Sequence, residues 1–492
     1  MQDLLKEPLW QEDSLGQPIP DSPHACAVSL PTWDSVVGYE EGREKIIAKM
    51  KTGYPRFFLH AFIKRLFVKA TEEIAGPGQK VILFAGKGPV QRAQRYVERF
   101  AKVATRITSY QRGLQALVVP EEAERTALEY WQHTGEIISS RQAEDLLADK
   151  NGESFGLSSS LLRQKVAETS GAPADHHYFL ESGMAAIFTA HRVVTGIHPG
   201  KKTLQLEFPY VDGLKVQEKF GSGVAFLYQA EGEDFDEAIR RIQEGEFAAV
   251  FCEAPSNPLL RTADLVRLAE ACRVGEVPLV IDDTVASAIN VDVLKVADLV
   301  TTSLTKWASG KGDVCAGMVT INPKSRWVEE FRAFLTEETE GGSRLYSGEM
   351  RVLWENIEGF EERVRRSNVN AAMVADYLRE HPAVEKVWYP SLVTREHYET
   401  IRRPDGGYGG LLSFSLKQAK KMPKVYDALR FCKGPSLGTE FTLASPYTML
   451  AHYHELDWAA ACGVPAELLR LSVGGEDGDV LLATLGAALE QV

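Results

Sequence analysis

The sequence lacks the composition that marks several large classes of protein. Its 40 glycines and 23 prolines make up about an eighth of the 492 residues and follow no period, whereas low-complexity and fibrous chains reach ~25 to 30%. Hydrophobic residues account for 44% and charged residues for 25%, which is ordinary for a folded protein and excludes disorder as the main state. At ~100 to 200 residues per domain, the length predicts two to four folded units.

Positive charge is also scarce. The chain has 55 lysines and arginines against 68 aspartates and glutamates, which gives a formal net charge of −13. Such a protein repels a phosphate backbone or an anionic membrane surface, so neither nucleic acid nor a membrane is expected as a partner. No apolar run approaches the ~18 residues that span a bilayer. The acidic start, MQDLLKEPLWQED, is expected to be neither a secretory signal nor a basic transit peptide.

Cysteine is too rare for a disulfide scaffold. The six cysteines are Cys26, Cys252, Cys272, Cys315, Cys432 and Cys462. None of them has the CxxC spacing or the histidine neighbours of a zinc site, so no metal site is expected. Several lie in apolar runs, where a free buried thiol is the expected state. A reducing, cytoplasmic compartment is therefore the expectation.

The N-terminal third is divided between an extended segment and a small α/β unit. Three prolines and little helical period predict an extended chain over the first 60 residues, with one charged helix over residues 38–51. Residues 78–131 then alternate strand, helix, strand, helix. Gly86-Lys87-Gly88 lacks the later residues of a Walker loop, so it is interpreted as a turn before a helix.

From about residue 176 the alternation becomes longer and more regular. Short apolar strands rich in β-branched residues alternate with amphipathic helices, which predicts a mostly parallel sheet covered on both faces. After residue 330 a long charged helical stretch leads into shorter strands, which favours a smaller α+β domain with an antiparallel sheet. The predicted division is an N-terminal extension at 1–150, a large α/β domain at 151–330 and a C-terminal α+β domain at 331–492.

Chemistry is expected where the predicted strands end, because parallel sheets bind ligands at the carboxyl ends of their strands. The polar groups found there are Ser182-Gly183-Met184, Pro209-Tyr210, Ser256-Asn257, Asp282-Asp283-Thr284 and Ser303-Leu304-Thr305-Lys306. Each alone has an ordinary structural explanation, such as a helix start, a helix cap or a solvated lysine.

The set is more informative than its members. Lys306 lies 24 residues after Asp282, in a Ser-x-Thr-Lys stretch, and follows a helix-start glycine, an aromatic residue and an asparagine. A pyridoxal phosphate site needs a Schiff-base lysine, an acid beside the pyridine nitrogen, a phosphate cup and a group that stacks on the ring. The order of residues therefore matches the parts of such a site.

With these residues, the sequence resembles the pyridoxal-phosphate enzymes of cysteine and methionine metabolism. Within that family it looks most like the long fungal cystathionine γ-synthases. The stretches that carry the resemblance are ESGMAAI at 181–187, EAPSNP at 253–258, VIDDT at 280–284, SLTKW at 303–307, GDVCAG at 312–317 and LLRLSVGGED at 468–477. The segments IPDSPHACAVSLPTW and TGYPRFF also resemble the N-terminal extension of the fungal enzymes. The implied fold is the aminotransferase-like fold type I.

The resemblance implies a role for each of these positions. Lys306 and Tyr210 are the implied catalytic residues, Lys306 binding the cofactor covalently and moving protons, Tyr210 covering the ring and assisting departure at Cγ. Asp282 is implied to keep the pyridine nitrogen protonated. The other implied cofactor residues are Gly183, Met184, Asn257, Thr284, Ser303, Thr305 and Arg141. Arg470, with help near Ser436, is implied to bind the substrate carboxylate.

Two stretches depart from the family pattern. The family carries Tyr-Ser-Arg in an arm that reaches the neighbouring subunit's phosphate, whereas this chain has Ser139-Ser140-Arg141. Arg141 keeps the charge, but the phenol is missing. The substrate loop Ser436-Leu437-Gly438-Thr439-Glu440-Phe441 is one residue shorter than the family's, so it does not fix which nucleophile is admitted.

The expected activity is γ-replacement, in which an O-activated L-homoserine (acetyl, succinyl or phospho) and L-cysteine give L-cystathionine in methionine biosynthesis by trans-sulfuration. The alternatives are a sulfhydrylase or a γ-lyase of the same family, and a catalytically silent scaffold that keeps the fold. The resemblance also implies a homodimer or homotetramer with shared active sites and small amino acids as substrates. The first 130 residues are expected to pack on the core and support assembly without carrying chemistry.

Overall fold

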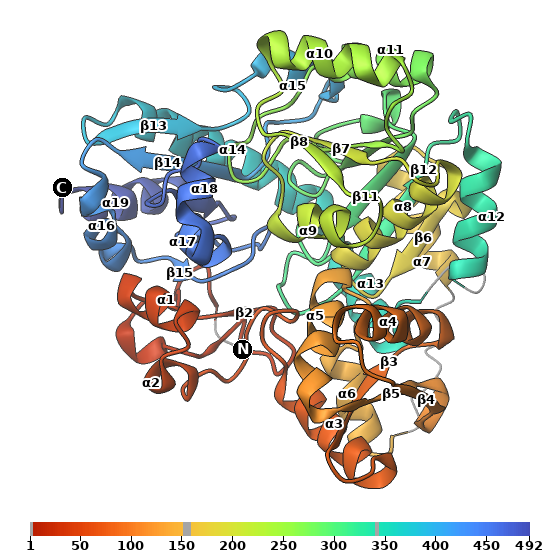
Figure 1. Ribbon diagram of the computed structural model, residues 1–492. Helices are drawn as coiled ribbons and strands as arrows, with labels where there is room; N and C mark the ends of the chain where they lie inside the picture. Colours follow the sequence, from red (N-terminus) through yellow and green to blue (C-terminus); the bar gives the residue numbers. More distant parts are fainter. Residues whose placement is uncertain (1–2, 151–158, 340–343) are drawn as a thin grey trace.

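The computed structural model describes residues 3–150, 159–339 and 344–492 (Figure 1). At its centre is a seven-stranded sheet in the order β6-β12-β11-β10-β9-β7-β8. Its strands are β6 (His177–Leu180), β7 (Thr203–Leu206), β8 (Val224–Leu227), β9 (Val250–Glu253), β10 (Leu279–Asp282), β11 (Leu299–Ser303) and β12 (Gly317–Ile321). Strand β12 runs antiparallel to both of its neighbours, and the other adjacent pairs are parallel. The predicted mostly parallel sheet is confirmed.

Both faces of this sheet are buried along its central strands. Along β9, Val250 and Cys252 pack into one apolar cluster, while Phe251 between them packs into another. The first cluster includes α10 (Gly232–Gln243) and α11 (Leu265–Gly275), and the second includes α8 (Gly183–Ile197) and α12 (Val328–Glu338). Alternating side chains thus serve opposite faces, as a sheet between two helical layers requires. Helices α7 (Ser159–Ser170) and α9 (Val211–Lys219) complete the large domain.

The C-terminal domain contains a five-stranded sheet in the order β13-β14-β17-β16-β15. The strands are β13 (Val384–Trp388), β14 (Leu411–Leu416), β15 (Cys432–Lys433), β16 (Leu443–Ser445) and β17 (Leu469–Ser472), antiparallel except for the pair β15 and β16. Its helices are α15 (Arg395–Ile401), α16 (Met422–Ala428), α17 (Tyr447–Ala451), α18 (Leu456–Ala461) and α19 (Gly478–Leu489). This agrees with the expected smaller α+β fold.

The boundary between the large and C-terminal domains differs from the predicted residue 330. Phe331 and Leu335 of α12 pack in the large-domain cluster, and α13 (Ser347–Ile357) contacts α7. The long helix α14 (Phe360–Glu380) then joins the domains, because its first turn packs near Trp307 and its later turns pack on β13 and β14. The other predicted boundary, at residue 151, lies outside the described residues.

The N-terminal region has its own three-stranded antiparallel sheet, ordered β3-β5-β4. Its strands are β3 (Gln79–Phe84), β4 (Arg106–Ser109) and β5 (Gln115–Pro120), covered by α3 (Ala61–Ile74), α4 (Lys87–Phe100), α5 (Glu124–Thr134) and α6 (Ser140–Leu147). The predicted strands and helices of this unit are present. Strand β4 was not predicted, because its sequence RITS is short and partly exposed.

The single helix predicted over residues 38–51 is wrong. Helix α1 (Trp33–Glu40) begins earlier, where Thr32 and Ser35 form a capping box. It ends before Gly42, whose φ of 66° is left-handed, and a separate short helix α2 (Glu44–Ile47) follows. The extended segment before them contains the paired short strands β1 (Pro18–Ile19) and β2 (Ala27–Val28).

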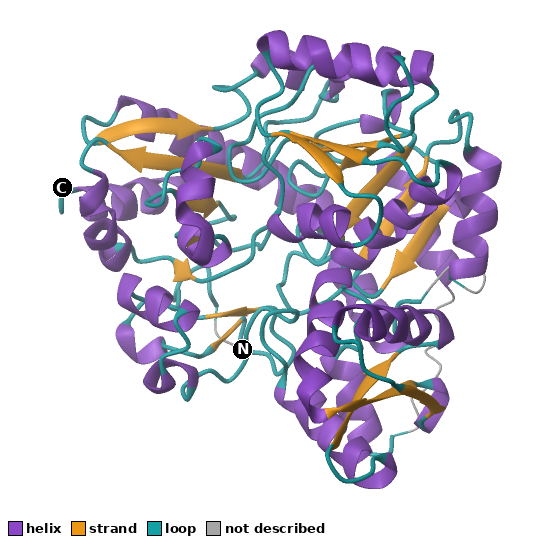
Figure 2. Cartoon of the chain, in the orientation of Figure 1, coloured by secondary structure: helices purple, strands orange, loops and turns teal. Residues whose placement is uncertain are grey.

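The N-terminal 150 residues contact both of the other domains (Figures 1 and 2). Residues of the first 40, such as Ile19, Val28 and Val36, pack in clusters with C-terminal-domain side chains. Residues 61–147 lie instead beside the large domain, where Arg92 of α4 pairs with Glu338 of α12 at 2.7 Å. Residues 50–60 must therefore cross from one domain to the other. No described helix is long and apolar enough to cross a membrane.

Candidate active site

Asp282 ends β10 with both carboxylate oxygens held by hydrogen bonds. Its Oδ1 accepts the backbone N–H of Thr284 at 2.9 Å, and its Oδ2 accepts the hydroxyl of Thr301 on β11 at 2.9 Å. Burial raises the pKa of Asp282, and the bonds from Thr284 and Thr301 oppose that rise. A carboxylate has about four lone-pair sites, so Asp282 can accept a further N–H from a ligand.

Lys306 lies in the turn after β11, with its side chain almost fully buried. Its amine donates to the phenol oxygen of Tyr54 at 3.0 Å and to the hydroxyl of Ser436 at 2.9 Å. Among the residues that the structure describes, no carboxylate lies within ion-pair distance of this amine. A buried lysine held only by hydroxyls can be used as a nucleophile or base, because no carboxylate fixes its proton.

The start of α8 offers an anion site beside the end of β11. Ser182 caps the helix by accepting the N–H of Ala185 at 3.0 Å, while the N–H groups of Gly183 and Met184 have no partner within the helix. A Cβ at Gly183 would lie 2.8 Å from the Ser303 hydroxyl, so only glycine permits this close approach. Thr305 is placed differently, since its hydroxyl is bonded to the backbone of Ala316.

Tyr210 precedes α9, and its phenol oxygen accepts a hydrogen bond from the guanidinium of Arg56. The same guanidinium pairs with Asp212 at 2.5 Å and donates to the carbonyl of Gln132 at 2.9 Å. Burial raises the pKa of Tyr210 well above its ordinary value, although the charge of Arg56 opposes this. Tyr210 therefore keeps its proton at neutral pH and can serve as a proton donor.

Arg470 contacts one predicted cofactor residue, Asn257, and one predicted substrate residue, Ser436. Its guanidinium donates to the side-chain oxygen of Asn257 at 2.9 Å and to the carbonyl of Ser436 at 2.7 Å, beneath the ring of Tyr447. Ser436 has a φ of 108°, a strained value for a residue other than glycine. This backbone geometry lets Ser436 contact Arg470 with its carbonyl and Lys306 with its hydroxyl.

Glu253, at the end of β9, connects the Tyr210 and Asn257 segments. One carboxylate oxygen accepts the backbone N–H of Tyr210 at 2.6 Å, and the other accepts that of Asn257 at 2.9 Å. Burial and the nearby charge of Asp282 raise the pKa of Glu253 to about 8. The strand end thus fixes the spacing between the two predicted cofactor residues.

Arg141 lies in a different network from the one that the resemblance implied. Its guanidinium donates to Glu349 at 2.7 Å and to the carbonyl of Asp313 at 2.6 Å, both within the same chain. Ser139 caps helix α6 by accepting the N–H of Gln142 at 3.1 Å. Within the described chain Arg141 is thus committed to other groups, and its role toward a phosphate stays a prediction.

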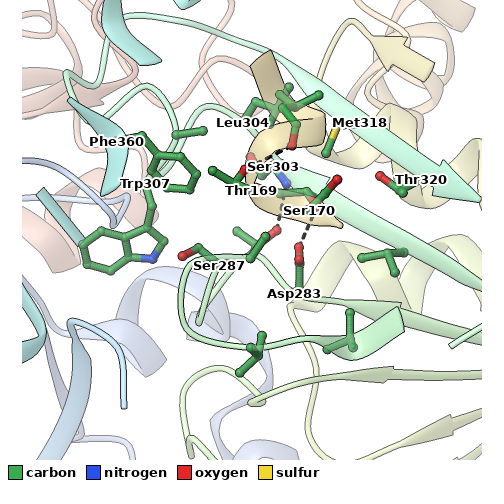
Figure 3. Close-up of a pocket in the computed structure, with 18 of the residues that line it drawn as sticks. Thr169, Ser170, Asp283, Ser287, Ser303, Leu304, Trp307, Met318, Thr320 and Phe360 are labelled. Atoms are coloured by element: carbon green, nitrogen blue, oxygen red, sulfur yellow. Dashed lines mark hydrogen bonds between the residues drawn. The ribbon is translucent and has the colours of Figure 1, made fainter. Parts of the chain in front are cut away.

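A pocket lies beside this cluster, between α7, the segment after β10 and the end of β11 (Figure 3). It is lined by Asp283, Ser287, Ser303 and Trp307 among others, and neither Lys306 nor Tyr210 is among its described lining residues. Asp283 accepts the hydroxyl of Thr302 at 2.6 Å. Burial raises the pKa of Asp283 to about 7, so an acid that titrates near neutrality stands next to Asp282.

The site also contains residues that were not predicted from the sequence, among them Tyr54, Arg56, Asp212 and Glu253. One signal was available. Tyr54-Pro55-Arg56 has the Tyr-x-Arg spacing that the Ser139-Ser140-Arg141 stretch lacks. Asp212 carried no such signal, because a lone acid in the first turn of a helix is common.

The donor set fits pyridoxal phosphate. The N–H groups of Gly183 and Met184 with the Ser303 hydroxyl suit its phosphate, the Asp282 carboxylate suits a protonated ring nitrogen, and Lys306 supplies the amine. The large mixed sheet with its smaller C-terminal domain is the fold type I arrangement. Fold and site together therefore define the class as pyridoxal-phosphate-dependent enzymes of fold type I.

Comparison with known proteins gives the family. The model of the Cys/Met metabolism PLP-dependent enzymes matches residues 154–490, and that of the fungal trans-sulfuration enzyme N-terminal domain matches residues 62–139. The chain belongs to the Cys/Met metabolism PLP-dependent enzyme family. The resemblance inferred from the sequence is confirmed, as are pyridoxal phosphate as cofactor and the transferase class.

Relatives align along nearly the whole chain. Cystathionine gamma-synthase of Neurospora crassa is 31% identical over 97% of this chain and 98% of its own length, and that of Saccharomyces cerevisiae is 30% identical over 97% and 99%. An L-2-amino-4-chloropent-4-enoate dechlorinase/desaturase of Streptantibioticus cattleyicolor is 30% identical over 94% and 96%. Among solved structures, cystathionine gamma synthase from Xanthomonas oryzae pv. oryzae, in complex with aminoacrylate and cysteine, superposes with a TM-score of 0.60 and 25% identity, covering 69% of this chain and 86% of that one.

Proposed function

We propose that the protein joins an O-activated L-homoserine, carrying an acetyl, succinyl or phospho group, to L-cysteine by γ-replacement, with L-cystathionine as the product. The observation that carries the proposal is the link from Arg470 through Ser436 to Lys306, with bonds of 2.7 and 2.9 Å. A guanidinium binds a carboxylate bidentately. An amino acid held on Arg470 would therefore present its α carbon close to the Lys306 amine.

The cofactor supplies an electron sink for negative charge that develops on substrate carbons. Gly183, Met184 and Ser303 would hold its phosphate. Asp282 would bind the ring nitrogen and Asn257 the ring hydroxyl. These roles use groups that already lie at the strand ends or at the start of α8.

Proton movement falls to Lys306 and Tyr210. The amine of Lys306 takes protons from the substrate's α and β carbons, a task for which an amine without a carboxylate partner is suited. The phenol of Tyr210 keeps its proton because burial raises its pKa, so it can protonate the group leaving Cγ. The C–O bond at Cγ breaks and a C–S bond forms; the thiol loses one proton and the leaving group gains one.

The full-length similarity to fungal cystathionine gamma-synthases, N-terminal domain included, supports replacement over elimination. We propose that the product serves methionine biosynthesis by trans-sulfuration, which the match to the fungal trans-sulfuration enzyme N-terminal domain supports. We also propose a homodimer or homotetramer that binds small amino acids in a reducing, cytoplasmic compartment. All six cysteines are free, which supports the reducing compartment.

The test is a product assay with three nucleophile conditions. Purified protein is incubated with O-acetyl-, O-succinyl- and O-phospho-L-homoserine, each with cysteine, with sulfide or with neither. The proposal predicts cystathionine as the main product with at least one donor. Homocysteine formed faster from sulfide would assign a sulfhydrylase, and 2-oxobutyrate formed equally fast without a nucleophile would assign a γ-lyase. Protein that takes up no pyridoxal phosphate and gives no product would assign a silent scaffold.

A further inference from the structure

The segment Thr52–Phe58 of the N-terminal extension enters the candidate active site. It lies outside both family matches, which begin at residues 62 and 154. Tyr54 accepts the hydrogen bond from the Lys306 amine at 3.0 Å, and that amine lies 4.7 Å from the centre of the Tyr54 ring. One of the two partners of the Lys306 amine therefore comes from a part of the chain that neither family model describes.

This segment is firmly held. The Thr52 hydroxyl donates to the carbonyl of Ala25 at 3.1 Å, and the N–H groups of Phe57 and Phe58 both donate to the Tyr54 carbonyl at 2.9 Å. A Cβ at Gly53 would lie 2.3 Å from the Phe58 Cβ, so the turn requires glycine. A side chain held on such a turn is preorganised for a role in the site.

Arg56 anchors the segment to the large domain through buried charge. Its guanidinium and the Asp212 carboxylate are 4% and 3% exposed and lie 2.5 Å apart. The second oxygen of Asp212 bonds the His133 ring at 3.1 Å, and that ring contacts Lys219 at 2.8 Å. A buried ion pair is costly unless its hydrogen bonds are satisfied, and here two further guanidinium N–H groups donate to the carbonyl of Gln132 and the phenol of Tyr210.

The stretch that corresponds to the family's Tyr-Ser-Arg arm is altered here. The stretch Ser139-Ser140-Arg141 has no tyrosine, and its arginine is committed to Glu349 and Asp313. Tyr54 and Arg56 have the same one-residue spacing, and both reach residues of the site, Lys306 and Tyr210. The extension therefore offers within one chain the pair of side chains that the arm lacks.

We propose that residues 52–58 complete the active site of their own chain. Tyr54 is a catalytic residue that holds the Lys306 amine while that amine gains the proton lost by a substrate carbon. The phenol oxygen accepts an N–H bond before and after the transfer and keeps its own proton. Arg56 is a positioning residue that orients the phenol of Tyr210. The inference rests on the proposed function insofar as Lys306 is taken to move protons in it.

The first test compares Tyr54→Phe with Tyr453→Phe in the full-length protein. Tyr453 donates to Glu41 of the extension at 2.6 Å. Tyr453→Phe therefore also removes one phenol hydrogen bond to the extension, but it removes no contact to Lys306. For Tyr54→Phe we expect kcat of γ-replacement to fall about 100-fold with KM within about threefold of wild type. Tyr453→Phe should keep wild-type kcat. A Tyr54→Phe variant that keeps more than a third of wild-type kcat would overturn the catalytic role.

A second readout does not depend on which reaction the enzyme performs. Pyridoxal phosphate is added to protein from which cofactor has been removed, and the appearance of the visible absorption band is timed. Loss of the Tyr54 contact misplaces the amine, so the band should form about 10-fold more slowly in Tyr54→Phe and at the wild-type rate in Tyr453→Phe. Equal rates in all three proteins would contradict the inference. A slow Tyr54→Phe in a protein that makes no cystathionine would sink only the proposed function.

Mixing subunits tests whether Tyr54 serves the site of its own chain or that of a neighbouring chain. Lys306→Ala and Tyr54→Phe proteins are co-expressed with different tags, and the doubly tagged species is purified. If Tyr54 serves its own chain, every site of the mixed oligomer is defective and activity stays at or below the level of Tyr54→Phe alone. Recovery to about half of wild-type activity in a mixed dimer, or about a quarter in a mixed tetramer, would mean that Tyr54 reaches a neighbour's site, which would overturn the assignment to one chain.

Discussion

At the scale of single residues, two lysines are buried among the residues that the structure describes, Lys306 and Lys433, and their surroundings distinguish them. Burial lowers the pKa of Lys433 to about 7, which alone would make it a candidate for Schiff-base chemistry. Its amine, however, donates to the carbonyls of Pro31 and Asp427, each at 2.9 Å. Lys433 therefore joins the extension to the C-terminal domain, whereas Lys306 lies with the groups that fit the cofactor.

Asp283 makes a residue-scale prediction about pH. Burial raises its pKa from 3.8 to about 7, so the folded protein binds this proton more tightly than the unfolded chain. The stabilisation that this bound proton gives is complete below about pH 4 and is lost as the pH rises to about 7. It amounts to at most roughly 4 kcal/mol of unfolding free energy. Asp283→Asn does not titrate, so its melting temperature should fall less steeply than wild type over this interval.

Thermal melting of the two proteins between pH 4.5 and 7.5 provides the measurement. Asp479→Asn, at an exposed position in the first turn of α19, serves as the control and should follow the wild-type slope. If the melting temperatures of wild type and Asp283→Asn change with pH in parallel, Asp283 ionises in the folded protein as it does in the unfolded chain.

The residues of the site could be predicted from the sequence only in part. Asp282, Lys306 and Gly183 follow apolar strands, and the rule that parallel strands bind ligands at their carboxyl ends was enough to find them. Tyr54 and Arg56 lie in a segment without a regular pattern, and only the folding of the chain brings them to Lys306 and Tyr210. Long-range contacts of this kind leave no periodic signal.

At the scale of elements, a buried charge network fastens α4 to the large domain. Arg92 pairs with Glu338 of α12 at 2.7 Å and also with Glu136. Burial would raise the pKa of Glu136, but Arg92 and Arg344 outweigh it and hold that pKa at about 2. The carboxylate is therefore ionised inside the protein, and its charge must be matched by these arginines.

Removal of one partner should loosen this attachment. Arg92→Met leaves buried carboxylates with less positive charge, which should cost about 3 to 5 kcal/mol of unfolding free energy. Urea denaturation measures this as a lower midpoint, with an early loss of the N-terminal region. Arg240→Met breaks an exposed pair with Glu237 on α10 and should leave the midpoint unchanged. Equal midpoints for all three proteins would show that the network contributes nothing to stability.

The elements themselves were predicted with uneven success, and the reasons are local. Strands β6 to β12 were predicted because most of them are buried on both faces, which gives continuous apolar runs, and the half-buried edge strand β8 keeps the apolar run VAFL. The helix predicted over 38–51 was wrong because the left-handed Gly42 stops α1 and the capping box at Thr32 moves its start. Strand β4, short and half-exposed, had no apolar pattern to mark it.

At the scale of the whole molecule, the extension connects the two halves of the catalytic core. Its first 40 residues pack on the C-terminal domain, residues 61–147 lie against the large domain, and residues 52–58 cross the site between them. That this region supports assembly without carrying chemistry stays a prediction, and our proposal for Tyr54 and Arg56 departs from it. Composition and charge could not reveal the contacts of these two residues, because they carry no information about how the chain folds.

The central claim is that Lys306 carries the cofactor in a site built from three regions of one chain. It is tested most directly by reducing the cofactor-loaded protein with borohydride, digesting it and locating the pyridoxyl group by mass spectrometry. The account predicts the group on the peptide that contains Lys306, and none at this position in Lys306→Ala. A group found on another lysine, such as the buried Lys433, or no group on any lysine, would contradict it.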